Sequence, residues 1–256
     1  MSLQIEKKLM KLLEQWPAGT VATTTWLKGQ GISGQLLSKY KQSGWVQPVG
    51  YGAFKRPGQV IRWPGALHAI QHQLNLQIHI GALTAITHRG TGHYVRMGKN
   101  TLYLFSQENI KLPAWFRNQN WSLVVEHKTT RMLPGRAGIK EFDIEGFRLA
   151  TSSLERAILE TLYLSPGSVD LVEAYHIVEG LFTLRPALVQ NLLESCSSIK
   201  VKRLFLFMAD KASLPVFKHL NLEKLDLGRG DRILVENGAY VAKYKLSVPK
   251  ELAWHD

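Results

Sequence analysis

The chain has 256 residues, of which 45% are apolar and 20% are charged, a composition typical of a folded protein with one or two domains. This apolar content excludes a mainly disordered chain, and the single cysteine, Cys196, excludes both an internal disulfide and a cysteine-cluster zinc site. The net charge of +12 does not bear on the fold, but it favours a polyanionic partner.

Charged residues interrupt the start of the chain, where a secretory signal would need an unbroken apolar stretch. The longest uncharged apolar run, residues 204–209, is far shorter than the roughly 18 residues of a membrane span. A lone cysteine in a chain of this size fits a reducing compartment. We therefore expect a cytoplasmic protein without a membrane partner.

The charge is unevenly distributed along the chain. Residues 1–95 contain ten bases and two acids, so they have a net charge of +8, whereas residues 96–256 have a net charge of +4. Between Thr20 and Arg56 there is no acidic residue. This asymmetry predicts two parts with different partners, although a generally basic surface would also account for part of it.

The N-terminal part begins with two predicted helices. Apolar residues spaced by three and four predict a helix over residues 3–15, and Trp16-Pro17 ends it because the residue before a proline avoids the helical conformation. Thr23 or Thr24 then caps a second, short helix through residues 26–28.

A third helix and a hairpin complete this part. Ser33 caps a helix over residues 34–43, Gly44 ends it, and two extended runs around Gly50-Tyr51-Gly52 predict a β-hairpin. Three helices and a hairpin in this order predict a winged helix-turn-helix. Its expected core side chains are Leu36, Leu37, Tyr40, Trp45 and Phe54.

The third helix is predicted to enter the major groove of DNA, because a helix fits this groove and its Gln and Lys side chains can pair with base edges. We expect it to read bases through Gln35, Ser38, Lys39 and Gln42. The DNA backbone is expected to contact Lys28, Lys41, Lys55 and Arg56, the last two on the hairpin at phosphates or in the minor groove. Ser33 and Tyr51 are also expected to bind DNA. Replacing both Lys39 and Arg56 by Ala is predicted to weaken promoter binding without unfolding. Two alternatives stay open: a merely solvated helix face and a winged helix that binds protein.

The rest of the chain mixes helices and strands, which predicts an α+β domain. Pro64-Gly65 is taken as the approximate end of the N-terminal part, and Ser152 with Glu155 three residues later predicts a capping box. Helices are predicted over residues 66–74, 81–86, 156–164, 169–180, 186–196 and 201–211. Strands are predicted over residues 101–105, 121–126, 141–145, 225–228, 233–236 and 240–248, with a further strand starting near Tyr94.

Two groups of side chains could in principle bind a metal ion. His68 and His72 lie four residues apart, but Ala69 replaces the glutamate that a zinc hydrolase helix needs, so two surface histidines are expected. His79, His88 and His93 are scattered, with no obvious acid or cysteine companion nearby in the sequence. Glu141, Asp143 and Glu145 alternate on one predicted strand, as in a magnesium site or a solvated strand face. We predict neither catalytic residues, nor a metal site, nor a cofactor.

Several segments resemble the AbiEi family of antitoxins, and together they cover nearly the whole chain. They are Gly92-His93-Tyr94, residues 102–105, 112–116, 151–160 and 201–206, Leu227-Gly228-Arg229-Gly230 and residues 244–249. The resemblance implies the antitoxin of a type IV toxin–antitoxin system, whose toxin, AbiEii, is a nucleotidyltransferase. It also implies that the N-terminal domain represses the operon by binding inverted repeats in its promoter. The C-terminal domain would then neutralise the toxin, and a stable complex with the toxin is not implied.

The sequence thus predicts an α+β protein with a winged helix-turn-helix domain at residues 1–85 and a mixed α/β antitoxin domain at residues 86–256. Its predicted function is that of an antitoxin and autorepressor, with double-stranded DNA as partner, and not that of an enzyme. Two alternatives remain: a ligand-responsive winged-helix transcription factor, and a metal-dependent enzyme that uses Glu141, Asp143 and Glu145.

Overall fold

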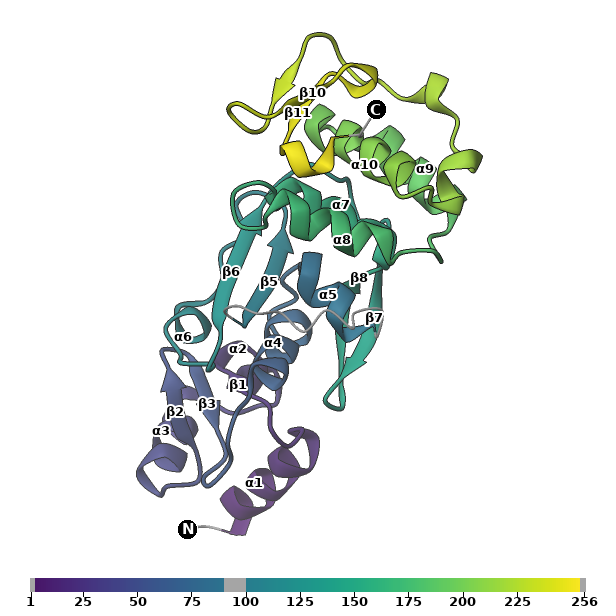
Figure 1. Cartoon of the computed structure of the whole chain (residues 1–256). Coiled ribbons are helices and arrows are strands. Elements are labelled where there is room, and N and C mark those ends of the chain that lie inside the picture. The colour runs from purple at the N-terminus through teal and green to yellow at the C-terminus, as the bar shows by residue number, and fades with distance from the viewer. Residues whose placement is uncertain (1–2, 90–99, 254–256) are drawn as a thin grey trace. The chain divides into compact units, whose positions relative to one another are not determined.

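The structure, a computed structural model, describes residues 3–89 and 100–253, and the side chains from residue 7 onward (Figure 1). The predicted strand near Tyr94, the segment Gly92-His93-Tyr94 and the isolated His93 lie outside these residues. The chain packs into two compact units. Unit 1 comprises Met1–Ile78, Asn109–Val125 and Glu141–Ala150, and unit 2 comprises His79–Glu108, Glu126–Lys140 and Thr151–Asp256.

These units interleave along the sequence, so one boundary at residue 85 does not describe them. Each unit combines helices and strands, which confirms the predicted α+β class. The cut between residues 85 and 86 stays a proposal about where the DNA-binding sequence ends.

Unit 1 begins with the predicted arrangement of three helices and a hairpin. The N-terminal elements are α1 Leu3–Gln15, β1 Ala22–Thr23, α2 Thr24–Gly29, α3 Gly34–Gln42, β2 Gln47–Gly50 and β3 Ala53–Lys55. The strands form an antiparallel sheet in the order β1-β3-β2, in which the hairpin is the wing. This confirms the predicted winged helix-turn-helix.

Local sequence explains where these helices start and stop. The hydroxyl of Thr23 accepts a hydrogen bond from the Trp26 N–H and caps α2, and the hydroxyl of Ser33 does the same for α3 with the Leu36 N–H. Gly44, with φ of +74°, follows α3 in a conformation that favours glycine.

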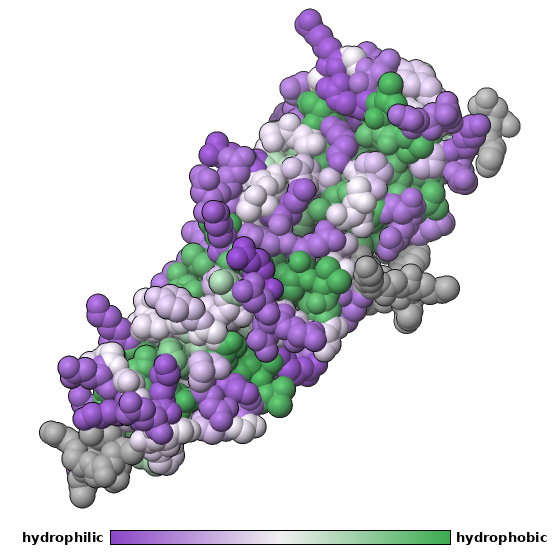
Figure 2. All heavy atoms as spheres, turned by 90° about the vertical axis from the view of Figure 1, so that its left-hand side faces the viewer, coloured by the Kyte–Doolittle hydropathy of each residue, from purple (hydrophilic) through white to green (hydrophobic). Residues whose placement is uncertain are grey.

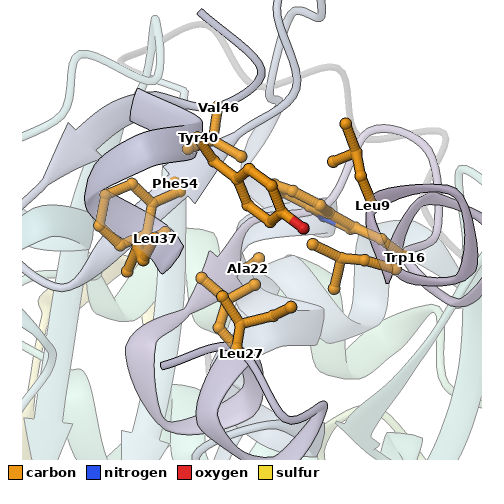
Figure 3. Packing of buried hydrophobic residues seen from close by; sticks show 10 residues of the cluster. Leu9, Trp16, Ala22, Leu27, Leu37, Tyr40, Val46 and Phe54 are labelled. Atoms are coloured by element: carbon orange, nitrogen blue, oxygen red, sulfur yellow. The ribbon is translucent and has the colours of Figure 1, made fainter. Parts of the chain in front are cut away.

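One apolar cluster holds α1, α2, α3 and the wing together (Figure 3). Trp16 and Tyr40 are fully buried at its centre, with Leu9 from α1 and Phe54 from β3 beside them. Of the five predicted core residues, Trp45 is wrong: its side chain is 43% exposed because it follows the Gly44 turn instead of lying on a packed face. Leu36 is half-buried.

The remaining elements of unit 1 come from later in the sequence. They include α4 Trp63–His72 and the short α6 Ala114–Arg117. Pro64-Gly65, predicted as the approximate end of the N-terminal part, lies instead in the first turn of α4. A proline is tolerated there because the backbone N–H groups of the first turn have no partner within the helix. A Cβ on Gly65 would overlap the carbonyl of Gly19, so the glycine lets these two backbones meet.

A five-stranded sheet has the order β6-β5-β4-β8-β7. Its strands are β4 Ile78–Ile80, β5 Thr101–Ser106, β6 Val124–Thr129, β7 Ile139–Ile144 and β8 Phe147–Ser152, with β4 parallel to β8. The strands predicted at 101–105 and 141–145 correspond to β5 and β7. The strand predicted at 121–126 begins three residues later, and β8 lacks a sequence prediction.

Unit 2 contains most of the other helices. These are α5 Ala82–His88, α7 Leu154–Leu164, α8 Leu171–Glu179, α9 Pro186–Ser195 and α10 Ile199–Lys211. A small sheet in the order β10-β11-β9 follows, formed by β9 Arg232–Ile233, β10 Ala239–Val241 and β11 Leu246–Val248. Short 3-10 turns at Pro215–His219, Leu222–Lys224, Ala242–Tyr244 and Lys250–Leu252 connect these elements. Residues 225–228, predicted as a strand, form none.

A buried carboxylate organises the start of α7. Glu160 accepts hydrogen bonds from Ser152 Oγ at 2.8 Å, Arg156 Nε at 2.8 Å and the Ala82 N–H at 3.1 Å, and its Oε1 lies 2.8 Å from His79 Nε2. Ser152 is therefore a partner of Glu160 and not the predicted helix cap. The helix starts one residue later, after Ser153.

Candidate nucleic-acid interface

The third helix presents one polar face. Gln35, Ser38, Lys39 and Gln42 follow the spacing i, i+3, i+4, i+7, so they form one stripe, and all four are exposed. Leu37 and Tyr40 point the other way into the apolar cluster. Packing thus fixes the rotation of α3 about its axis. The four residues predicted to read bases all face outward, which base reading requires.

The second helix and the cap of α3 add groups beside this stripe. Lys28, in the last turn of α2, and Lys41 on α3 are exposed, and the Lys41 ammonium lies 6.0 Å from the centre of the Phe54 ring. Ser33 is exposed, but its hydroxyl oxygen accepts the Leu36 N–H. Its hydroxyl proton remains available to donate to a phosphate.

The wing differs from the prediction in its cations. Arg56 Nη2 donates to the Leu13 carbonyl at 2.5 Å, and the guanidinium lies 5.6 Å from the centre of the Trp16 ring. Burial lowers the pKa of Arg56, and its Nε is buried without a partner among the described residues. Arg56 therefore links the end of the wing to α1, and its contact with phosphate stays a prediction. Removing it would perturb the fold, so it does not suit a test of DNA contact.

The tip of the wing is uncharged. Tyr51, between Gly50 and Gly52, has 98% of its surface exposed, which is compatible with the predicted contact. Lys55 Nζ donates to the Gln59 carbonyl at 3.1 Å, so one of its three N–H groups is already used. The cations predicted for the wing are thus turned toward the protein.

Glu141 and Asp143 of β7 and Glu145, which follows the strand, do not gather into a metal site. Glu141 pairs with Arg148 at 3.3 Å, Glu145 pairs with Arg62 at 2.9 Å, and Asp143 Oδ1 accepts the Gly146 N–H. Across residues 3–89 and 100–253, no group of three or more His, Cys, Asp or Glu side chains is arranged to hold a metal ion.

The histidine pair of α4 is a packing contact. The His68 and His72 rings lie 4.3 Å apart, and burial, with a contribution from His72, lowers the pKa of His68 to about 4. His72 Nε2 lies 3.0 Å from the Arg148 carbonyl. At neutral pH His68 is uncharged.

No helix in the described residues combines the length and apolar character needed to cross a membrane. The face turned toward the viewer in Figure 2 carries mostly hydrophilic side chains, with apolar ones in separate patches.

Two family models match the chain. The AbiEi antitoxin N-terminal domain, described as a transcriptional regulator, matches residues 5–97, and the AbiEi antitoxin of type IV toxin–antitoxin systems, also a transcriptional regulator, matches residues 99–249. A search of curated proteins yields no match. Among solved structures, the RV2827C protein from Mycobacterium tuberculosis aligns over 96% of this chain and 92% of that chain, with a TM-score of 0.62 and 13% identity. At this identity the similarity shows the fold alone.

Proposed function

Because the chain belongs to the AbiEi family of antitoxins and transcriptional regulators of type IV toxin–antitoxin systems, we propose that it represses its own operon by binding inverted repeats in the promoter through α3 and the wing. The observation that carries this proposal is the exposed polar stripe of α3 in a stretch without acids. A duplex of uniform negative charge meets there only neutral and basic side chains.

The dimensions of the stripe suit a base-reading role. A helix of nine residues is about 13 Å long, and the major groove is about 12 Å wide, so α3 fits with its polar side against the base edges. Gln35 and Gln42 have the amide geometry that pairs with adenine, and Lys39 can donate to guanine. An inverted repeat presents two such sites, so we propose two copies of the chain on each operator.

The second part of the proposal is the antitoxin activity. We propose that residues 86–256 oppose a nucleotidyltransferase toxin encoded beside this chain, without requiring a stable complex. Both family models name the AbiEi antitoxin, and the one that follows the N-terminal domain covers residues 99–249, outside the polar stripe. Repression and neutralisation should therefore be separable by substitution. Since a repressor acts where its promoter is, we also propose that the chain works in the cytoplasm.

A mobility-shift titration with the operon's own upstream duplex tests the DNA-binding part. Lys39→Ala is expected to weaken binding about tenfold and to lower the slope of log affinity against log salt if Lys39 also neutralises a phosphate. Lys11→Ala, which removes an exposed lysine of α1, is the matched control and should bind like the parent chain. Equal affinities for the Lys39→Ala variant and the parent would contradict the proposal.

Growth of cells that express the neighbouring toxin tests the antitoxin part. The Lys39→Ala variant should lose repression and still rescue growth, because Lys39 lies outside residues 86–256. Failure of the parent chain to rescue growth would contradict the antitoxin assignment.

A further inference from the structure

Both cations at the end of the wing already make hydrogen bonds within the protein. Both basic residues at its end, Lys55 and Arg56, donate to carbonyl groups of their own unit, and the tip residue Tyr51 is neutral. A wing that lies along a DNA backbone normally needs positive charge, because the phosphate contacts supply most of the affinity. A segment that packs against the wing is therefore the place to look for further positive charge.

The short helix α6 packs directly on the wing. A Cβ placed on Gly50, the last residue of β2, would lie 2.7 Å from the Trp115 Cβ and 3.1 Å from the Trp115 Cα. Only a glycine therefore lets the α6 backbone approach the end of β2 this closely. Figure 1 shows α6 beside the β2–β3 hairpin, and both belong to unit 1.

The helix is firmly held in this position. Trp115 and Phe116 are buried, and the Trp121 indole N–H donates to the Phe116 carbonyl at 2.8 Å. The Phe116 ring lies 5.0 Å from the Trp121 ring. The residues that follow Phe116 thus project from a rigid base next to the wing tip.

The outer side of this segment is basic and polar. Residues 109–125 contain two bases, Lys111 and Arg117, and no acid. Arg117 and Lys111 are exposed, and neither side chain has a hydrogen-bond or ion-pair partner anywhere in residues 3–89 and 100–253. Asn118, Gln119 and Asn120 are exposed as well. These are the residue types that bind phosphate oxygens.

We propose that α6 and its flanks form an additional backbone clamp for duplex DNA, with Arg117 and Lys111 binding phosphates beside the wing. The clamp rests on the proposed DNA-binding function and deepens it. Two residues along a helix advance only about 3 Å, so the Arg117 backbone lies close to the Trp115–Gly50 contact, and the turn of about 200° between the two residues directs the exposed Arg117 side chain away from the buried Trp115. It fixes the register of the protein on DNA and carries no base specificity.

The test measures the salt dependence of binding by the full chain to two probes, the operon's upstream duplex and an unrelated duplex of equal length. Replacing Lys111 and Arg117 by Gln is expected to lower the log–log salt slope by about 1.8 on both probes, since each phosphate contact contributes about 0.9. Lys218→Gln with Lys224→Gln removes the same charge from exposed sites of unit 2 and should leave the slope unchanged. Arg117→Lys should restore half of the loss when combined with Lys111→Gln.

The two probes keep the outcomes apart. If Lys39→Ala abolishes preference for the promoter while the Lys111→Gln/Arg117→Gln variant keeps the parental slope, the clamp is refuted and the repressor proposal stands. The parent chain could instead show no preference for the promoter while the Lys111→Gln/Arg117→Gln variant has a smaller salt slope on both probes. The clamp is then supported and the repressor proposal fails. A slope that falls equally in the Lys218→Gln/Lys224→Gln control refutes the clamp, because net charge alone then explains the loss.

Discussion

Replacing Glu160 by Gln tests whether a buried ion network stabilises unit 2. The Glu160 side chain is 1% exposed, and its two oxygens take four hydrogen bonds: Oε1 from Arg156 and His79, and Oε2 from Ser152 and the Ala82 N–H. An amide has one acceptor oxygen, so its NH₂ group meets either the Ala82 N–H or the Arg156 Nε–H. One buried donor is then opposed by another donor.

The cost follows from what is left without a partner. Arg156 keeps its bond to the Ala137 carbonyl but loses the charge of the Glu160 carboxylate, and breaking a buried pair in this way costs about 3–5 kcal/mol. Ala82 has φ of +45°, a conformation that costs a non-glycine residue about 1 kcal/mol and that the bond to Glu160 compensates. We expect a loss of about 3–5 kcal/mol, or roughly 10 °C in Tm.

Acidification should reduce this difference. Burial raises the pKa of Glu160, but the opposing effects of His79 and Arg156 are larger together, so the pKa is lowered from its ordinary value of 4.5. The stabilisation is therefore complete above about pH 4.5 and is lost as the pH falls through the folded-state pKa. Denaturant unfolding followed by circular dichroism at pH 7 and pH 4 measures both effects.

Glu194→Gln provides the control, because Glu194 is an exposed glutamate on α9 that accepts one bond from Gln190. It should change stability by less than about 0.5 kcal/mol. If Glu160→Gln unfolds within that margin of the parent chain, the network does not stabilise unit 2 and the reasoning is refuted.

Two further substitutions test the packing of the DNA-binding unit. Arg56→Ala should lower stability by about 2 kcal/mol, because it removes a bond to the Leu13 carbonyl and the contact with Trp16, and a melt that matches the parent would show that Arg56 is free to bind DNA. Gly50→Ala should destabilise the protein by about 1–3 kcal/mol, since the added methyl group overlaps Trp115. It should also weaken DNA binding, because it displaces α6. Unchanged melting would show that α6 does not pack on the wing.

The N-terminal helices are predictable from sequence because short-range signals determine them. The cap at Ser33, the apolar spacing of Leu37 and Tyr40, and the left-handed Gly44 all act within one or two turns of helix. The outward stripe of α3 follows from the same periodicity, so the residues proposed to read bases are accessible to sequence reasoning.

Contacts that are distant in sequence escaped prediction. Arg56 looks like any exposed wing cation until the carbonyl of Leu13, 43 residues earlier, is placed beside it. Likewise, nothing near Gly50 in the sequence indicates Trp115, and only the fold brings α6 to the wing. Ser152 fits a capping box locally, yet the buried Glu160 uses its hydroxyl instead.

The central claim is that α3 reads bases in the promoter of the chain's own operon. The most direct measurement is the affinity of the parent chain and of Gln35→Ala for the natural inverted repeat and for a set of duplexes with one base pair changed in each half-site. We predict that changing one particular base pair costs the parent chain about 1–3 kcal/mol of binding free energy. The Gln35→Ala variant should bind the natural and the changed duplex equally well at that base pair. Discrimination by Gln35→Ala equal to that of the parent at every base pair would contradict the claim.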